Sequence, residues 1–193
     1  MRYYYIYDHV DEKINYASLS ITPESNERLA KAGVELYDAQ RGMPLSAKID
    51  HLTFQFNPDE GDVLEDFMRD VGWVLVSDKM KAAIECIQKE NLEFIPVSII
   101  NSKTQEVVSQ SYYVLVVTRL TDCFQREKSI WFKTSSYISV TILAIDGNRL
   151  DGQHVLRVVE DPFRLVVSQK IYKKLRQEKL TGMSFGNVSV IYQ

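Results

Sequence analysis

Two segments of the sequence, ninety-one positions apart, follow one pattern and stay in register without a gap. They read VLVSDKM at 74–80 and LVVSQKI at 165–171, and the correspondence continues to residues 99 and 190. Six residues are identical at this spacing: Val76, Ser77, Lys79, Phe94, Val97 and Ser98 recur as Val167, Ser168, Lys170, Phe185, Val188 and Ser189. The chain therefore encodes one local structure twice, by duplication or as two solutions to the same packing problem, with a period too long for a solenoid.

Each copy predicts a strand, a serine-capped helix and a second strand. The β-branched run favours a strand, and the hydroxyl of Ser77 or Ser168 can accept a hydrogen bond from an unpaired amide of the first helical turn. In the first copy an apolar stripe has the spacing of one helix face: Met80, Ala83, Ile84 and Ile87. In the second copy Lys174 and Glu178 replace two of these residues, so that helix is expected nearer to solvent.

The segments around the two copies predict further strands and helices. The chain between the copies is rich in β-branched residues, and Asp161-Pro162 is expected to break it before the second copy. Near the start, Thr22-Pro23 predicts a helix cap and first turn, with Gly33 as the stop. Asp62–Val71 predicts a short amphipathic helix. The expected fold class is α+β, with mixed, mostly antiparallel sheets and a twice-occurring strand–helix–strand unit equivalent at 74–99 and 165–190.

Charge is unevenly divided along the chain. The 193 residues have a net charge of −3, but residues 1–70 carry 7 basic against 14 acidic side chains, a balance of −7. Residues 71–193 carry 16 against 12, a balance of +4. We therefore expect an acidic N-terminal region, 1–70, with strands and short helices, and a repeat-containing α+β region, 71–193, packed together as one compact unit.

The sequence predicts a cytoplasmic protein. Its first residues, MRYYYIYDHVDEK, are acidic and rich in tyrosine where a signal peptide needs a basic start and an apolar run. No stretch approaches the roughly twenty continuous apolar residues of a membrane span, so no membrane partner is expected. The two cysteines, Cys86 and Cys123, form no CxxC pair and no disulfide framework, which agrees with a reducing compartment.

The search for catalytic and metal-binding motifs finds none. The sequence contains none of the motifs GxSxG, GxxxxGK, HExxH and a GxGxxG that follows a strand. The three histidines form no cluster with zinc-ligand spacing. We therefore expect no catalytic residues, no metal, no cofactor and no enzyme activity. The enzyme hypothesis that stays open is a site assembled from distant residues such as Asp122, Cys123 and His154.

A candidate binding surface precedes the first copy of the repeat. Six acids, which we call the acidic segment, fall within a dozen residues: Asp59, Glu60, Asp62, Glu65, Asp66 and Asp70. They predict a phosphate-like patch that docks on a basic partner; the alternative is a solvated face with acids at a helix N-terminus. The helix after Ser168 is basic, but nucleic-acid binding is not expected, because the whole chain is acidic and only Tyr172 accompanies the basic residues.

A series of short motifs follows a fixed order through residues 40–186. It consists of GMPL at 42–45, EDF at 65–67, VLVS at 74–77, LEFIPV at 92–97, YVL at 113–115 with Asp122, HVLR at 154–157, LVVS at 165–168 and LTGMSF at 180–185. In this order the chain resembles the Imm11 family of bacterial immunity proteins, formerly a domain of unknown function. Residues 1–40 have no counterpart in these motifs.

The resemblance implies a cytoplasmic protein of bacterial competition, encoded beside a polymorphic toxin that it binds and inhibits in the producing cell. An inhibitor of this kind needs a stable scaffold and a complementary surface of ~800 Å², and the lack of catalytic motifs agrees with that need. The implied partner is the cognate toxin domain. The alternative is a non-enzymatic interaction or adaptor module with another partner, and a toxin gene next to this one separates the two hypotheses.

Overall fold

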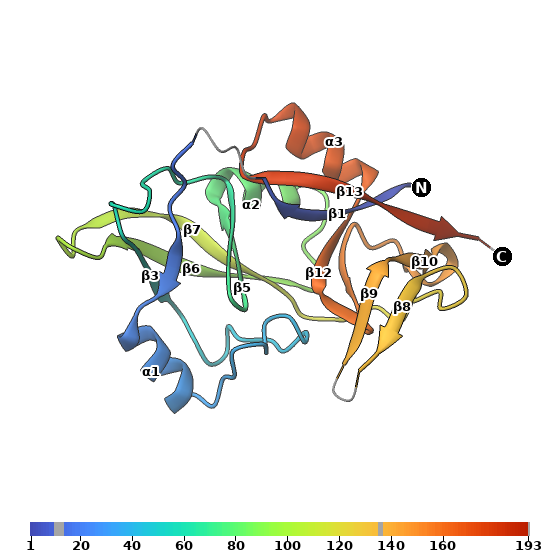
Figure 1. The fold of residues 1–193 in the computed structure, drawn as a ribbon, viewed down its shortest axis with the longest axis horizontal. Coiled ribbons are helices and arrows are strands. Elements are labelled where there is room, and N and C mark those ends of the chain that lie inside the picture. The colour runs from blue at the N-terminus through green and yellow to red at the C-terminus, as the bar shows by residue number, and fades with distance from the viewer. Residues whose placement is uncertain (10–13, 135–136, 193) are drawn as a thin grey trace.

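The computed structural model describes residues 1–9, 14–134 and 137–192 of the chain. The first sheet and its helices consist of β2 (Leu19–Ile21), α1 (Pro23–Lys31), β3 (Leu52–Phe56), β4 (Phe67–Asp70), β5 (Trp73–Ser77), α2 (Asp78–Glu85), β6 (Leu92–Asn101) and β7 (Val107–Val117). The second sheet and its helices consist of β1 (Tyr3–Asp8), β10 (Ala144–Asp146), η1 (Gly147–Arg149), β11 (Val155–Val158), β12 (Asp161–Ser168), α3 (Gln169–Gln177) and β13 (Met183–Ile191). A separate hairpin consists of β8 (Ile130–Lys133) and β9 (Ile138–Ile142). This combination of helices and mostly antiparallel sheets confirms the predicted α+β class (Figure 1).

The predicted serine caps are present and have the same geometry. Ser77 Oγ accepts a hydrogen bond from the Met80 amide at 3.2 Å, and Ser168 Oγ accepts one from the Ile171 amide at 3.4 Å. The ψ angles of the two serines are 163° and 162°. Each helix follows one strand, β5 or β12, and precedes another, β6 or β13, so the strand–helix–strand unit occurs twice. The cap predicted at Thr22 is present too, at the start of α1.

The correspondence extends from the repeat to whole sheets. The second sheet has the strand order β10-β13-β1-β12-β11, which matches β3-β6-β7-β5-β4 of the first sheet in position and direction. The parallel pairs follow the same offset. Thr53 pairs with Ser98 in the first sheet, and the residues ninety-one positions later, Ala144 and Ser189, pair in the second sheet. We call these two five-stranded sets, each with its helix α2 or α3, the first unit and the second unit.

The N-terminal strand β1 completes the second unit. In the first unit β7 lies antiparallel between β6 and β5, with Tyr112 opposite Ser77. In the second unit β1 takes the equivalent place between β13 and β12, with Tyr3 opposite Ser168. The middle strand of the second unit therefore comes from the opposite end of the chain, which gives residues 1–8 a structural role that no sequence motif indicated.

Helices α2 and α3 pack side by side where the two units meet (Figure 1). Met80 and Ile84 of α2 and Ile171 and Leu175 of α3 are at most 1% exposed and belong to one buried cluster. Apolar residues from both sheets complete this cluster. The rest of α3 is polar and partly exposed, in agreement with the prediction that the second helix lies nearer to solvent.

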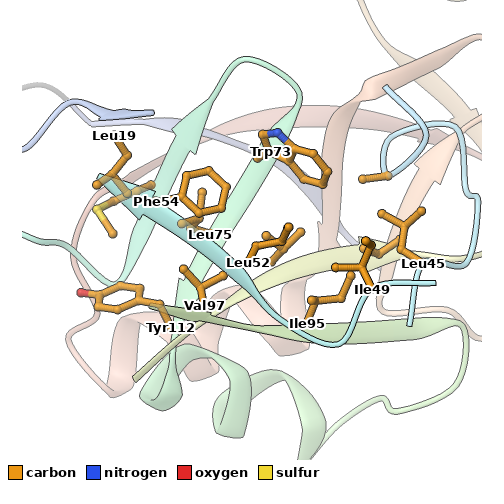
Figure 2. Packing of buried hydrophobic residues seen from close by; sticks show 14 of the residues in the cluster. Leu19, Leu45, Ile49, Leu52, Phe54, Trp73, Leu75, Ile95, Val97 and Tyr112 are labelled. Atoms are coloured by element: carbon orange, nitrogen blue, oxygen red, sulfur yellow. The ribbon is translucent and has the colours of Figure 1, made fainter. Parts of the chain in front are cut away.

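The opposite face of the first sheet has its own core. Leu52, Phe54 and Trp73 are at most 1% exposed there, and Phe54 packs edge-on against Trp73 with ring centroids 6.4 Å apart (Figure 2). Leu45 and Ile49, from the segment between α1 and β3, cover this face. The domain boundary predicted at residue 70 stays a prediction; the first sheet takes strands from both sides of it.

Two polar clasps join the units, and each involves a capping serine. In the first clasp Ser77 donates its hydroxyl hydrogen to Asp66 Oδ1 at 2.6 Å, and Asp66 Oδ2 accepts from the Thr181 amide at 3.0 Å. Thr181 lies in the loop after α3. A residue of the second unit therefore holds the carboxylate that supports the helix cap of the first unit.

The second clasp is the reciprocal of the first. Ser168 Oγ lies 2.8 Å from His154 Nδ1, and the His154 amide donates to Gln88 Oε1 at 2.6 Å. Gln88 lies in the loop after α2, so here the first unit holds the residue that supports the cap of the second. Ser168 Oγ also accepts from the Ile171 amide, and in the tautomer with an unprotonated Nδ1 the serine hydroxyl donates its hydrogen to His154.

We expect the second clasp to make stability sensitive to mild acid. Burial, with Lys170 nearby, lowers the pKa of His154 below its ordinary value of 6.5. A group with a lowered folded-state pKa contributes stability above its unfolded pKa and loses it as pH falls through the folded pKa. The melting temperature should therefore fall between about pH 7 and pH 5. His154→Asp should flatten this dependence, because a carboxylate there can accept from Ser168 as Asp66 accepts from Ser77.

His154→Ala is the control for this prediction. It should also flatten the pH dependence, but it should lower the free energy of unfolding at neutral pH by about 1–3 kcal/mol, because the buried Ser168 hydroxyl loses its acceptor. Thermal melts of the three proteins across this pH range measure both effects. Equal pH slopes in all three would contradict the assigned role of His154.

The helix predicted over Asp62–Val71 is wrong. The segment forms a loop followed by β4, in which Phe67 lies opposite Val76 of β5. The apolar residues in the segment have helical spacing, but hydrogen bonding to β5 and burial of Phe67, which is 1% exposed, favour a strand at this edge of the sheet. Local periodicity was therefore outweighed by a tertiary pairing.

The break expected at Asp161-Pro162 is also wrong. Asp161 is the first residue of β12 and lies opposite Val158 of β11, so the chain reverses at Val159 and Glu160 instead. Proline is tolerated near the first residue of a strand, where its missing amide removes no bond from the centre of the sheet.

Candidate functional site

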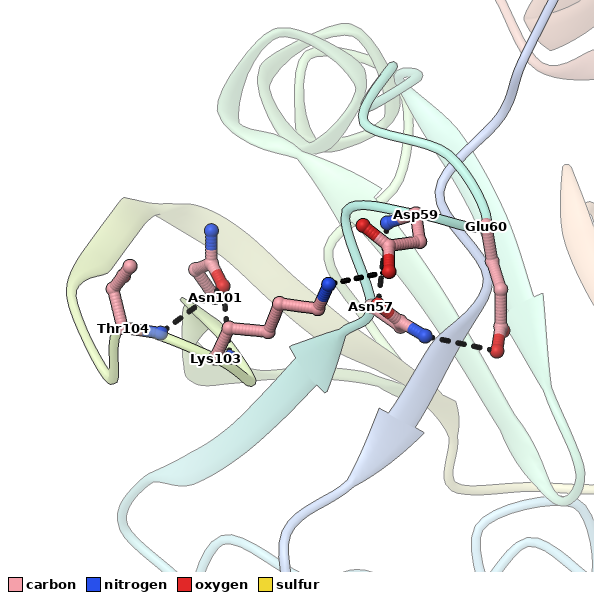
Figure 3. A network of polar contacts seen from close by, with 6 residues as sticks. All are labelled: Asn57, Asp59, Glu60, Asn101, Lys103 and Thr104. Atoms are coloured by element: carbon pink, nitrogen blue, oxygen red, sulfur yellow. Dashed lines mark hydrogen bonds and ion pairs between the residues drawn. The ribbon is translucent and has the colours of Figure 1, made fainter.

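The structure places the acids of the acidic segment in different surroundings. Asp59 forms an ion pair with Lys103, from the turn between β6 and β7, and Glu60 accepts from Asn57 Nδ2 at 3.0 Å (Figure 3). Asp59, Glu60 and Asp62 are exposed to solvent. These three form the accessible part of the acidic segment.

The other three acids of the segment are partly buried. Asp66 belongs to the first clasp, and burial raises the pKa of both Glu65 and Asp70 above the ordinary value. Glu65 lines a small cavity of about 130 Å³ together with Asp8 and His9. Whether the six acids contact a partner stays a prediction, and Asp66 already has an intramolecular role.

The residues of the hypothetical catalytic site have other partners. Cys123 is fully buried, and burial, with Glu160 and Asp122 nearby, raises the pKa of its thiol to about 12. A thiol with this pKa stays protonated at neutral pH and is a poor nucleophile. Asp122 is ion-paired with Arg149 at 3.1 Å, and His154 belongs to the second clasp. Within the described ranges no group of three or more His, Cys, Asp or Glu side chains could hold a metal ion.

A groove with exposed apolar walls lies beside the β8–β9 hairpin. We call it the hairpin groove; it has a volume of about 910 Å³ and is lined by β9, the turn between β11 and β12, and the segment around Tyr37. Tyr137, Val159 and Phe163 in its walls are 61%, 48% and 44% exposed. Tyr37 packs edge-on against Phe163, with ring centroids 5.5 Å apart. Large apolar side chains that are exposed together in this way are typical of a binding surface.

The charged residues of the hairpin groove include two carboxylates, each with a buried oxygen that accepts no hydrogen bond within the described residues. The side chain of Glu160 is 14% exposed, and its Oε1 lies 3.6 Å from Arg126 Nη2. Its Oε2 has no hydrogen-bond partner among the residues that the structure describes. Asp161 Oδ2 also lacks a hydrogen bond within the described residues, and it forms an ion pair with Arg164 Nε at 3.0 Å. The Oε2 oxygen of Glu160 is buried, so a group that enters the groove does not reach it without a side-chain rearrangement.

Strand β9 borders the hairpin groove and has a strand partner on one side. On its other side Arg164 Nη2 donates to the Val140 carbonyl at 2.8 Å. Sequence reasoning missed this groove, because Asp161-Pro162 was interpreted as a break and no motif marks the hairpin. The available signal was the apolar pair Val159 and Phe163 on either side of two acids.

Comparison with models of known protein families shows to which family this chain belongs. The model of the immunity protein family Imm11 matches residues 4–190. The chain belongs to this family. The match to Imm11 covers both units and includes β1, so it extends the resemblance to the first forty residues, for which the short motifs had no counterpart. A search of the curated proteins found no match. In the described part of this Imm11 protein, no helix is both long and apolar enough to cross a membrane.

Proposed function

We propose that this Imm11 protein binds and neutralises a cognate polymorphic toxin in the cytoplasm of the cell that produces it. The family match over residues 4–190 carries the proposal. Inhibition by binding requires a stable scaffold and an accessible surface, and no bond has to be made or broken by the inhibitor. The clasped units supply a scaffold, and the exposed acids and the hairpin groove are candidate surfaces.

Co-expression with the product of the neighbouring toxin gene tests this function. The toxin alone should stop growth, and co-expression with this protein should restore growth and yield a complex of fixed stoichiometry. A toxin with a disabled active site should still co-purify, because binding does not depend on its activity. If well-expressed, folded protein leaves the killing undiminished, the proposal is wrong, and capture of a different partner would favour the adaptor alternative.

The accessible acids lead to a separate prediction about the rate of binding. Serine at Asp59, Glu60 and Asp62 should slow association with a basic toxin by about tenfold at low salt and weaken its salt dependence, because exposed charge mainly steers encounter. The matched control replaces Glu24, Glu27 and Glu35, three exposed acids outside the acidic segment, with serine. Stopped-flow association at several salt concentrations measures the effect. Equal rates for the two variants would remove the acidic segment from the interface.

A further inference from the structure

We propose that Asp151-Gly152 is a site of spontaneous isoaspartate formation in the folded protein, and that the other Asp-Gly pair of the chain, Asp146-Gly147, is protected from the same reaction by its packing. The inference is independent of the proposed function, because the reaction needs only the chain itself and water. Aspartate followed by glycine is especially prone to this reaction, since glycine has no side chain to shield its amide nitrogen.

The reaction joins the amide nitrogen of Gly152 to Cγ of the Asp151 carboxyl group. A carbon–nitrogen bond forms, the carboxyl hydroxyl leaves with the amide hydrogen as water, and a succinimide ring results. A water molecule then opens the ring. Attack at the side-chain carbonyl restores aspartate, whereas attack at the main-chain carbonyl leaves the chain running through the side-chain carbonyl, which is isoaspartate. The mass of the protein is unchanged, but the backbone gains one methylene group.

The turn that contains Asp151-Gly152 leaves the reacting groups accessible. Asp151 and Gly152 are both exposed, and the Gln153 amide closes the turn on the Leu150 carbonyl at 2.8 Å. The φ angles of the two central residues are 49° and 72°, as in a type I′ turn. No atom outside the neighbouring residues lies within 4 Å of the place where a side chain on Gly152 would begin. The glycine nitrogen is therefore open to approach.

The carboxylate of Asp151 is only weakly held. It forms an ion pair with Arg119 Nη2 at 3.4 Å, between side chains that are 61% and 60% exposed. Ion pairs between exposed side chains contribute little. The Asp151 side chain can therefore leave Arg119 and turn toward the following amide when the turn fluctuates.

Asp146-Gly147 has the same sequence but a fixed geometry. Asp146 is the last residue of β10, where its amide donates to the Cys123 carbonyl at 2.7 Å. Its Oδ1 accepts from the Asn148 amide at 2.9 Å and so caps η1. Gly147 is packed so closely under the ring of Tyr192 that a side chain at this position would overlap the ring. The Asp146 carboxylate cannot reach the Gly147 nitrogen without breaking these contacts.

Isoaspartate at position 151 should weaken the second clasp. Gln153, directly after the turn, is 6% exposed, and its carbonyl accepts from the Tyr3 hydroxyl at 2.6 Å. His154 of the second clasp is the next residue. An additional backbone methylene in the turn displaces Gln153 and His154 from closely packed positions, which have little room to adapt. The modification should therefore lower the melting temperature.

The test ages the folded wild type near neutral pH and maps isoaspartate by peptide mass spectrometry, with the urea-unfolded chain aged in parallel. The unfolded chain should form isoaspartate at both positions, 146 and 151, and the folded protein should form it at 151 alone. Asp151→Gly is the matched control, because glycine keeps the positive φ and removes the carboxyl group. Aged wild type should melt at a lower temperature than fresh protein, and aged Asp151→Gly should melt like fresh Asp151→Gly.

Each outcome supports or overturns one part of the inference. If the folded protein forms isoaspartate at 146 as readily as at 151, the assigned protection is wrong. If position 151 reacts only in the unfolded chain, the native turn shields it and the site is overturned. If isoaspartate forms at 151 and the melting temperature stays that of fresh protein, or if aged Asp151→Gly loses as much stability as the wild type, the link to the second clasp is wrong.

Discussion

Removal of residues 1–8 is expected to abolish folding of this Imm11 protein. These residues contain β1, which is hydrogen-bonded to β12 on one side and to β13 on the other. Its loss leaves two strand edges unpaired in the middle of the second sheet and empties the positions of Tyr3 and Ile6, which are 3% and 2% exposed. The expected cost is comparable with the whole stability of a typical domain, ~5–15 kcal/mol. Circular dichroism and thermal melting of the truncated chain measure it.

A circular permutant distinguishes the need for β1 from the need for its position in the chain. Gln193 is joined to Met1 by a short linker, and the chain is opened between Thr104 and Gln105, in the turn between β6 and β7. The junction is feasible because the Met1 amino group donates to the Tyr192 hydroxyl at 2.8 Å. The two units then exchange their connectivity, so the permutant should fold with a melting temperature lowered by no more than roughly 10 °C. A permutant that is expressed but unfolded would contradict the equivalence of β1 and β7.

Truncation of the contact between α2 and α3 should have the second large effect. Ile84→Ala and Leu175→Ala should each lower the free energy of unfolding by about 2–5 kcal/mol, because each leaves a cavity in the cluster shared by both units. The double variant should deviate from the sum of the single effects by about 0.5–3 kcal/mol, as expected for residues that pack in one cluster. Denaturant unfolding of all three variants completes the cycle.

Val71→Ala is the control for this pair. Val71 is 64% exposed, so its truncation should change the free energy of unfolding by less than about 0.5 kcal/mol. Strict additivity of Ile84→Ala and Leu175→Ala would mean that the two helices do not pack on each other, and the description of the interface between the units would have to change.

The predictions from sequence succeeded where the interacting groups are close together in the chain. Ser77 and Ser168 each bind an amide three residues ahead, and the apolar stripe of α2 repeats every three or four residues. The β-branched runs before the two serines form strands in both units. The Imm11 resemblance was confirmed as well, by the family match over residues 4–190.

The predictions from sequence failed where a residue distant in the chain decides the local structure. Helical spacing over Asp62–Val71 was outweighed by pairing with β5, and the turn before β12 lies at Val159-Glu160 instead of at the proline. The hairpin groove was missed, because its walls come from segments around residues 37, 140 and 160 that meet only after folding, and the pair Val159 and Phe163 alone did not indicate it.

By itself the sequence determined the two serine-capped strand–helix–strand units and the family of the chain, because capping bonds and helix faces depend on residues within a few positions of one another. The tertiary structure alone decided that β1 completes the second unit, that the two clasps are reciprocal, and that apolar side chains gather around Glu160. Each of these brings together residues dozens of positions apart or more, and the free energy that selects such contacts comes from burial and pairing in the folded molecule, which no local pattern records.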